Sequence, residues 1–350
     1  MLNAGVIGFG YWGPNIVRNL SSTKGITVTK VCDRRLEAIS RLQQEFPSIE
    51  TTSSAAEILE SPLIDMVAVV TPVSSHYELA KRALQNGKHV FVEKPFTDTV
   101  EHARELIELA ESKNLKIMVD HTFLFTGAVR SIKDLIDKGT LGKIYYYDST
   151  RVNLGLFQHD VNVVWDLGPH DLSIMDFLIS EQPTALTANG IAHVNKMEDM
   201  AYVTLYFQSN LIAHFNVNWL SPVKVRTTLI GGEKKMLYWN DVDPDEKIKI
   251  YDKGVDVKNR EGIYNLLVSY RSGDMWAPKI DATEALKLEC KHFLECIETG
   301  KDPINDGKSG MRVVRLLEAC NESLKGRGKL IDLSARFSEC AGVNPGMLVG

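Results

Sequence analysis

Three residues have side chains suited to acid–base chemistry and stand in positions that favour it. Lys94 follows almost directly on the apolar stretch 89–92, so it lies at the end of a predicted strand. Asp166 and His170 are four residues apart, which places both on one face of a helix. A histidine near a helix N-terminus is pushed toward its neutral form, the form that a general base needs. Their positions alone leave a catalytic role open beside two alternatives, a solvated lysine and a structural Asp–His pair.

The helix that carries Asp166 and His170 is predicted from Pro169. Proline is tolerated in the first helical turn, where its missing N–H group costs no hydrogen bond. We therefore expect this helix to begin near Asp166 or Leu167 and to run to Leu178.

A glycine-rich segment near the beginning of the sequence has the spacing of a dinucleotide-binding loop. It fits GxGxxG, follows an apolar stretch and precedes a helical pattern. The first glycine permits a tight turn, the second lets the backbone approach a pyrophosphate, and the third allows close helix–strand packing. The helix N-terminus favours the phosphate charge. A glycine turn that binds no ligand is the alternative. The residues expected to bind the cofactor here are Gly8, Phe9, Gly10, Tyr11, Trp12 and Gly13.

The choice between NAD and NADP depends on the end of the next predicted strand. Asp33 stands there, about 20 residues after the loop, where a carboxylate accepts from the ribose 2′-hydroxyl and repels a 2′-phosphate. This position favours NAD. Arg34 and Arg35 follow directly, and an arginine here can instead hold the 2′-phosphate of NADP.

Further residues lie where other predicted strands end. The carboxyl ends of parallel strands face the ligand crevice of such a sheet. Thr71 and Pro72 close the apolar stretch 64–70 and Glu93 ends another strand, so we expect them at the cofactor as well. His76 begins the next helix and either approaches the cofactor or only sits near the helix N-terminus.

The elements that must position these residues change in character along the chain. Up to residue 121, strand-like and helix-like segments alternate, which is typical of a parallel sheet with helices on both faces. Long stretches rich in Tyr, Val, Thr and Ile then indicate an open, mainly antiparallel sheet. The fold class is α/β: a Rossmann domain over 1–121, an α+β domain over 122–338 and a tail over 339–350.

The individual elements follow from the periodicity of apolar residues and from turn signals. Gln208-Ser-Asn210 is expected to be a hairpin turn between two strands. Helices are expected over 14–20, 36–46, 75–86, 99–113, 128–138, 282–299 and 310–325, and strands of the second domain over 143–152, 185–194, 200–208, 211–219 and 224–230.

Composition excludes several other classes of protein. A chain of 350 residues exceeds one ordinary core and favours two domains. The net charge of −5 offers no basic footprint for nucleic acid. The longest apolar run, 66–70, is far shorter than the ~20 residues that span a bilayer, and no signal peptide pattern is seen. We expect a cytoplasmic protein with no membrane partner. Its five cysteines lack CxxC spacing and are expected to be reduced, mostly buried thiols.

Together these motifs resemble the glucose–fructose oxidoreductase/inositol dehydrogenase/MocA (Gfo/Idh/MocA) superfamily. GFGYWG, the tripeptide EKP and the DxxxH pair occur there in this order, and the resemblance covers nearly the whole chain. It implies an NAD(P)-dependent oxidoreductase acting on CH–OH groups, without a metal. It implies further that Lys94 contacts substrate and nicotinamide, that Asp166 orients the substrate, and that His170 is the acid/base. Trp165, beside this pair, is expected at the cofactor.

The segment from Arg151 to Asp171 resembles a narrower group, the enzymes that oxidise the 3-hydroxyl of UDP-N-acetylglucosamine or its uronic acid. This resemblance implies a nucleotide-linked sugar as substrate. An arginine fork binds two phosphate oxygens, so Arg151 is the candidate for the diphosphate, and a structural ion pair is its alternative. Lys224 and Arg226 are further candidates. Besides the three catalytic residues and Arg151, the expected substrate contacts are His121, Asn153 and Gln158.

Two other functions stay open at this point. One is a dehydrogenase or ketoreductase of a free sugar or inositol. The other is a non-catalytic NAD-binding regulator, because fold does not imply function. In either case a homodimer or homotetramer is expected, since the strands of the second domain have few helices beside them and an uncovered apolar face is a typical interface.

Overall fold

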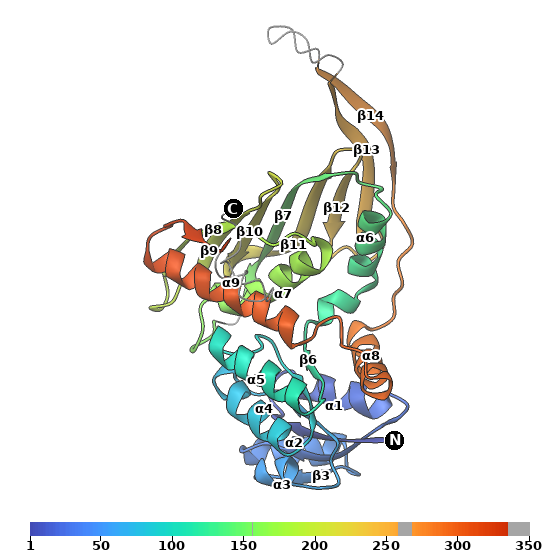
Figure 1. Ribbon diagram of the computed structural model, residues 1–350, viewed down its shortest axis with the longest axis vertical. Coiled ribbons are helices and arrows are strands. Elements are labelled where there is room, and N and C mark those ends of the chain that lie inside the picture. The colour runs from blue at the N-terminus through green and yellow to red at the C-terminus, as the bar shows by residue number, and fades with distance from the viewer. Residues whose placement is uncertain (156, 258–267, 335–350) are drawn as a thin grey trace, which may run out of the picture. The chain divides into compact units, whose positions relative to one another are not determined.

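The computed structural model describes residues 1–155, 157–257 and 268–334 (Figure 1). None of the helices within these ranges is both long and apolar enough to cross a lipid bilayer. Cys340 lies outside them. The cysteines inside them are unpaired and buried, as expected: Cys32, Cys290, Cys296 and Cys320.

The described residues divide into two compact units. The first combines residues 1–126 with 282–316, and the second combines 127–281 with the residues from Leu317 onward. The segment 282–316 thus lies in the first unit, whereas the sequence placed it in the second domain. The expected tail lies outside the described residues.

The first unit is a Rossmann domain, as predicted. Its six strands form a parallel sheet in the order β3-β2-β1-β4-β5-β6, and the order reverses between β1 and β4, where such sheets bind ligands. All four residues of β4 are buried, as helices on both faces require. Its elements are β1 (Leu2–Ile7), α1 (Gly13–Ser22), β2 (Ile26–Cys32), α2 (Leu36–Glu45), β3 (Glu50–Thr52), α3 (Ala56–Leu59), β4 (Met66–Val69), η1 (Val73–Ser75), α4 (His76–Gln85), β5 (His89–Val92), α5 (Val100–Ser112), β6 (Ile117–Val119), η2 (Thr122–Phe125) and α8 (Ala285–Thr299).

Helix α8 joins the first unit from far along the chain. Leu286, Phe293 and Leu294 belong to the same buried core as the residues of β1 and α1. The Phe293 ring lies 6.2 Å from the ring of Phe91 in β5. Helical periodicity predicts that α8 has an apolar face, but it does not say which sheet that face covers.

The second unit is built on a nine-stranded sheet in the order β14-β13-β12-β11-β7-β10-β9-β8-β15. All its strand pairs are antiparallel except β7 with β10, so the predicted mainly antiparallel sheet is confirmed. The predicted hairpin joins β9 to β10, and β12 to β14 were not foreseen. The elements are α6 (Gly127–Asp137), β7 (Ile144–Leu154), α7 (Val163–Leu178), β8 (Ala185–Ile191), β9 (Met200–Tyr206), β10 (Ile212–Asn218), β11 (Leu220–Gly232), β12 (Met236–Asn240), β13 (Ile248–Val257), β14 (Val268–Trp276) and β15 (Ile331–Asp332), with α9 (Gly307–Lys325) divided between the units.

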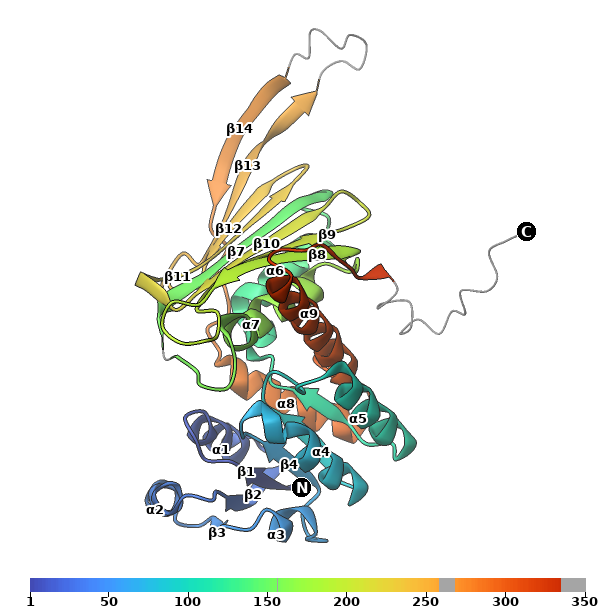
Figure 2. The same ribbon diagram turned by 90° about the vertical axis from the view of Figure 1, so that its left-hand side faces the viewer.

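The two faces of this sheet differ in what covers them. Helices α6 and α7 and the part of α9 in this unit lie on one face (Figure 2). The side chains of β9 and β10 that point to these helices, such as Val203 and Phe215, are buried. Figure 2 shows no described helix over the opposite face. Large side chains are exposed there: Tyr202, Tyr206, Ile212 and Leu229.

A buried ion pair joins β7 to α7 in this unit. Arg151 donates to the Asp171 carboxylate through Nε at 2.6 Å and Nη2 at 3.1 Å, and Ser149 Oγ donates to it at 3.0 Å. Both charged side chains are only 4% exposed. Across the ladder Arg226 faces Arg151 and pairs with Asp241 at 3.6 Å. Arg151 thus forms the structural ion pair, which corrects the prediction that it binds a diphosphate.

Replacing Arg151 by Met keeps the side-chain volume but leaves a buried carboxylate without its main counter-charge. We expect Arg151→Met to lower the free energy of unfolding in urea by about 3–5 kcal/mol. The double variant Arg151→Met/Asp171→Leu removes both charges and should recover most of this loss. As a control, Lys138→Met removes an exposed pair with Asp134 and should cost less than about 1 kcal/mol. A single variant as stable as the unmodified chain would contradict the structural role.

Candidate active site

The glycine loop lies between the carboxyl end of β1 and the start of α1. Gly8 has a φ of +104°, and a Cβ there would lie 2.1 Å from the Val70 carbonyl oxygen, so only glycine fits. A Cβ at Gly13 would lie 2.9 Å from the oxygen of Gly8, so this glycine lets α1 approach β1 closely. A Cβ at Gly10 would meet only Arg35 Nη2, at 3.9 Å. The backbone at Gly10 is therefore open to a ligand.

Asp33, the residue after β2, is tied to this loop. Its Oδ2 accepts from the Phe9 amide at 2.8 Å, and the Arg35 guanidinium donates to both carboxylate oxygens at 3.0 Å. Burial opposes ionisation of Asp33, but the hydrogen bonds from Arg35 and Phe9 outweigh it and lower its pKa. Asp33 is therefore an anion at neutral pH. Arg35 is the cation bound to Asp33, and both Arg34 and Arg35 are exposed.

A second arginine of the loop was missed by the sequence reasoning. Arg41 of α2 donates through Nη2 to the carbonyl oxygens of Phe9 at 3.0 Å and Gly10 at 3.1 Å. Its guanidinium lies 4.9 Å from the centre of the Phe9 ring. Nothing in the spacing along α2 marks this residue, because the contact runs between elements. Of the remaining loop residues, Tyr11 is exposed and Trp12 is partly buried.

These residues fit a dinucleotide. The backbone is open at Gly10, α1 has no side-chain cap and no acidic residue in its first turn, and Asp33 offers an acceptor for a ribose hydroxyl. The loop from Gly8 to Gly13 would hold the pyrophosphate of NAD, and Asp33 its adenosine ribose.

His76 is not placed as a cofactor contact. Its ring is fully buried, with Nδ1 2.9 Å from the Pro95 carbonyl oxygen and Nε2 2.7 Å from that of Thr71. Burial lowers its pKa, so the ring is neutral at neutral pH. The neutral ring donates to one of these two oxygens and lies between the loop after β4, with Thr71 and Pro72, and the loop after β5. Of the two alternatives, these contacts favour a position at the helix N-terminus over an approach to the cofactor.

In the first unit, charged and polar residues gather at the carboxyl ends of β5 and β6. Glu93 and Lys94 follow β5, and Asp120 and His121 follow β6. Burial, together with the positive charge of Lys94, lowers the pKa of His121 to about 3. His121 is therefore a neutral imidazole close to Lys94, able to exchange hydrogen bonds but not to act as a cation.

In the second unit, α7 carries Asp166 and His170 and begins one turn earlier than predicted. Asn162 caps the helix, because its Oδ1 accepts from the Trp165 amide at 3.1 Å. Pro169 consequently lies inside the helix, and Asp166 lies in its first turn. The expectation that Pro169 marks the first turn is therefore wrong, and the capping asparagine is the signal that would have corrected it.

Asp166 and His170 nevertheless share one partly exposed face of α7, as their spacing predicts. Trp219, between β10 and β11, donates through Nε1 to Asp166 Oδ2 at 3.1 Å. The Trp219 ring is fully buried and lies 5.4 Å from the ring of Phe157. A rigid indole thus orients the Asp166 carboxylate. Sequence reasoning missed Trp219, because no local pattern connects it to α7.

Three further predicted residues lie in the second unit. Trp165 is buried in the first turn of α7. Asn153, near the end of β7, and Gln158, in the segment that leads to α7, are partly exposed. A contact of Trp165 with the cofactor and contacts of Asn153 and Gln158 with a substrate stay predictions.

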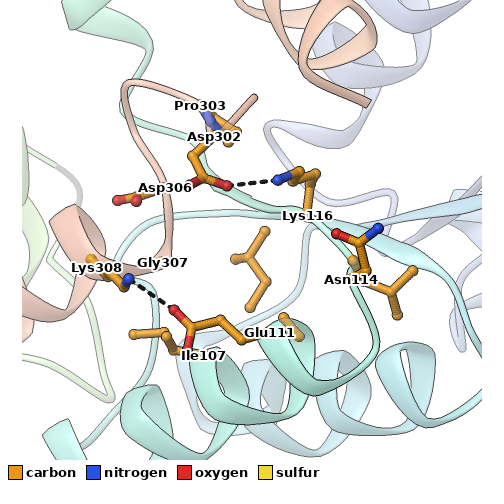
Figure 3. Close-up of a pocket in the computed structure, with 12 residues that line it drawn as sticks. Ile107, Glu111, Asn114, Lys116, Asp302, Pro303, Asp306, Gly307 and Lys308 are labelled. Atoms are coloured by element: carbon orange, nitrogen blue, oxygen red, sulfur yellow. Dashed lines mark hydrogen bonds and ion pairs between the residues drawn. The ribbon is translucent and has the colours of Figure 1, made fainter. Parts of the chain in front are cut away.

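A cavity of about 200 Å³ in the first unit lies apart from these residues (Figure 3). Ion pairs join Lys116 to Asp302 at 2.7 Å and Lys308 to Glu111 at 2.8 Å along its lining. Lys116 precedes β6, whereas Asp120 follows it. The cavity therefore lies at the opposite end of β6 from the candidate active site.

Known proteins resemble the chain over most of its length. The scyllo-inositol 2-dehydrogenase (NAD(+)) of Bacillus subtilis (strain 168) is 26% identical over 318 residues, 87% of each chain. The UDP-N-acetylglucosamine 3-dehydrogenase of Acidithiobacillus ferrooxidans is 26% identical over 326 residues, 89% of this chain and 94% of the relative. A solved oxidoreductase from Agrobacterium radiobacter, in complex with NAD+, L-tartaric acid and magnesium, has the same fold, with a TM-score of 0.80 at 18% identity over 96% of this chain and 99% of that one.

Family models account for both domains. A model of an oxidoreductase family with an NAD-binding Rossmann fold matches residues 2–121, and a model of the GFO/IDH/MocA C-terminal domain matches residues 129–238. With the glycine loop and the sheet of the second unit in place, these matches lead to one conclusion: the chain belongs to the Gfo/Idh/MocA family of NAD-binding oxidoreductases.

Proposed function

We propose that the chain oxidises a secondary hydroxyl, at C3, of a nucleotide-linked sugar such as UDP-N-acetylglucosamine or its uronic acid. The observation that carries the catalytic part is the Asp166–His170 pair on one face of α7, with Asp166 held by Trp219. A non-catalytic regulator has no need of such a pair. The relative from Acidithiobacillus ferrooxidans supports the nucleotide sugar. The equally similar inositol dehydrogenase of Bacillus subtilis supports inositol or a free sugar as the second candidate.

The proposed mechanism divides the work among three side chains. NAD, when bound, supplies the hydride acceptor. His170 removes the hydroxyl proton as general base, and Asp166 fixes the orientation of His170 or of a substrate hydroxyl. The ammonium group of Lys94 stabilises the negative charge that grows on the substrate oxygen. Lys94 lies in the first unit and the other two in the second, so the mechanism requires both units.

The proposed substrate contacts differ from the sequence prediction in the residue that binds the diphosphate. Arg151 is committed to Asp171 and Arg226 to Asp241, so neither is the diphosphate ligand. Lys224, which is exposed on β11, is the proposed ligand of the diphosphate instead. His121, Asn153 and Gln158 remain proposed contacts for sugar hydroxyls.

We also propose that two or more copies associate through the uncovered face of the second-unit sheet. Tyr202, Tyr206, Ile212 and Leu229 form an apolar and aromatic surface there. Two such faces packed together satisfy a two-fold axis, which makes a homodimer or homotetramer the expected assembly.

Steady-state assays with a panel of alcohols test the substrate class. We expect kcat/KM for a UDP-sugar to exceed that for inositol or glucose by roughly tenfold or more, the effect of one charge-assisted phosphate contact. Lys224→Ala should then raise KM for the UDP-sugar more than it lowers kcat, because a remote phosphate contact is kept through the transition state. Lys138→Ala, an exposed lysine elsewhere in the chain, is the control. A higher kcat/KM for inositol or glucose would reject the nucleotide sugar.

Replacement of His170 tests the general base. We expect His170→Ala to lower kcat by about 10²–10⁴-fold, the usual contribution of a positioned base. The dissociation constant of NAD, measured by calorimetry, should stay nearly unchanged, because the glycine loop is in the other unit. His214→Ala, on the sheet of the same unit, should leave kcat unaffected. If His170→Ala keeps kcat within a few-fold of the unmodified chain, another group takes the proton.

Cofactor preference follows from the charges at Asp33. We expect NAD to bind more tightly than NADP by roughly tenfold or more, because the Asp33 carboxylate repels a 2′-phosphate. Asp33→Ala should narrow this preference and Arg35→Ala should widen it, as calorimetry with both cofactors would measure. Equal affinities of the unmodified chain for NAD and NADP would mean that the arginines beside Asp33 offset its repulsion of the 2′-phosphate.

A further inference from the structure

A buried polar cluster in the first unit holds one residue of the glycine loop. Trp12 Nε1 donates to Asp120 Oδ2 at 2.9 Å, and the Thr122 hydroxyl donates to Asp120 Oδ1. Asp120 is only 2% exposed. Trp12 precedes Gly13 and is the residue at which α1 begins. The Asp120 carboxylate therefore fixes the side chain at the junction between the loop and the helix.

A second carboxyl group lies beside Asp120. Glu289 of α8 is fully buried, and its Oε1 accepts from Asn305 Nδ2 at 2.7 Å. Asn305 is itself bound to both backbone groups of Val119, the last residue of β6, at 2.7 and 2.9 Å. This arrangement holds Glu289 next to the residue that follows β6. Its other carboxyl oxygen, Oε2, is buried and has no hydrogen-bond partner among the described residues.

The surroundings of the two acids affect their pKa values differently. Burial and the neighbouring Asp120 raise the pKa of Glu289 well above its usual range, so Glu289 carries a proton at neutral pH. Burial also raises the pKa of Asp120, but the hydrogen bonds from Thr122 and Trp12 and the charge of Lys94 oppose this shift. The charge of Asp120 is thus opposed by burial and supported by Thr122, Trp12 and Lys94.

We propose that Asp120 is a positioning residue for NAD binding, which acts through Trp12 to keep the loop and the first turn of α1 in their binding geometry. A protonated Glu289 places no second negative charge beside Asp120. An indole has a donor and no acceptor, so only an acceptor such as Asp120 can hold it in this way. A loop ordered before the cofactor arrives binds it more tightly, because less ordering is left to be done on binding.

Calorimetric titration of NAD into single variants tests this role without any sugar substrate. We expect Trp12→Phe and Asp120→Leu each to raise the dissociation constant of NAD by about tenfold, the effect of losing a hydrogen bond to a charged group. The double variant should be no weaker than either single variant, because both remove the same interaction. Tyr77→Phe, which removes a phenol–carboxylate hydrogen bond to Glu105 elsewhere in the unit, is the control and should leave NAD binding unchanged.

The conservative change at Glu289 separates this role from a merely structural one. Glu289→Gln keeps a neutral side chain at this buried position and an oxygen for Asn305 Nδ2, so the dissociation constant of NAD should stay within about twofold. Glu289→Leu leaves Asn305 Nδ2 without this acceptor beside β6 and should weaken NAD binding as Asp120→Leu does. If Asp120→Leu does not fold, Trp12→Phe, at a partly exposed position, still tests whether the Trp12–Asp120 hydrogen bond supports NAD binding.

Two results would overturn the proposal: an unchanged NAD dissociation constant in Trp12→Phe, or a Glu289→Gln variant as weak as Glu289→Leu. Neither depends on the substrate. A chain that binds NAD as described but oxidises no UDP-sugar would contradict the proposed function and leave this inference standing.

Discussion

The close approach of the turn after β1 to the end of β4 determines the rest of the first unit. A side chain at Gly8 would collide with the Val70 carbonyl at 2.1 Å, and one at Gly13 would lie 2.9 Å from the Gly8 oxygen. Hydrogen bonds of 2.8 Å from Gly8 N to Cys32 O and from Val70 N to Ile7 O fix the turn between its two neighbouring strands. The carboxyl ends of these strands therefore meet at one edge. Asp33, Thr71, Lys94 and Asp120 all follow strands at that edge, and this is why residues far apart in the sequence lie along one edge of the sheet.

Every buried charge discussed above is balanced by a specific partner, and the partner determines the role of the residue. Asp33 is balanced by Arg35, whose side chain stays largely exposed, so this pair remains accessible to a ligand. Arg151 and Asp171 balance each other inside the second unit, and there the pair supports the packing of α7 on the sheet. Asp120 accepts hydrogen bonds from the neutral donors Trp12 and Thr122, and the charge of Lys94 favours its ionised form. A charged residue type alone therefore does not identify a ligand contact; the degree of burial and the partner do.

The parts of this molecule that sequence could predict are those with local causes. The glycine loop, the alternation of strands and helices and the spacing of Asp166 and His170 depend on neighbouring residues, and the structure has them as expected. The predicted start of α7 was wrong because it was based on Pro169, whereas Asn162 caps the helix. The position of α8, the role of Arg151 and the contacts of Trp12, Arg41 and Trp219 depend on which elements meet in space. The periodicity of apolar residues does not predict which elements meet, because an apolar helix face or an arginine on a strand gives the same sequence pattern with any partner.

An indole–carboxylate hydrogen bond occurs in each unit, with the burial of the two groups reversed. In the second unit the Trp219 indole is fully buried and the Asp166 carboxylate is partly exposed, so the indole is the anchor and the carboxylate is held in place. In the first unit Asp120 is buried and Trp12 is partly exposed, so the carboxylate is the anchor and the indole is held in place. An indole N–H suits both tasks because it is rigid and can only donate. A neutral indole also leaves the charge of the carboxylate in place, so the same bond can orient an exposed carboxylate or be anchored by a buried one.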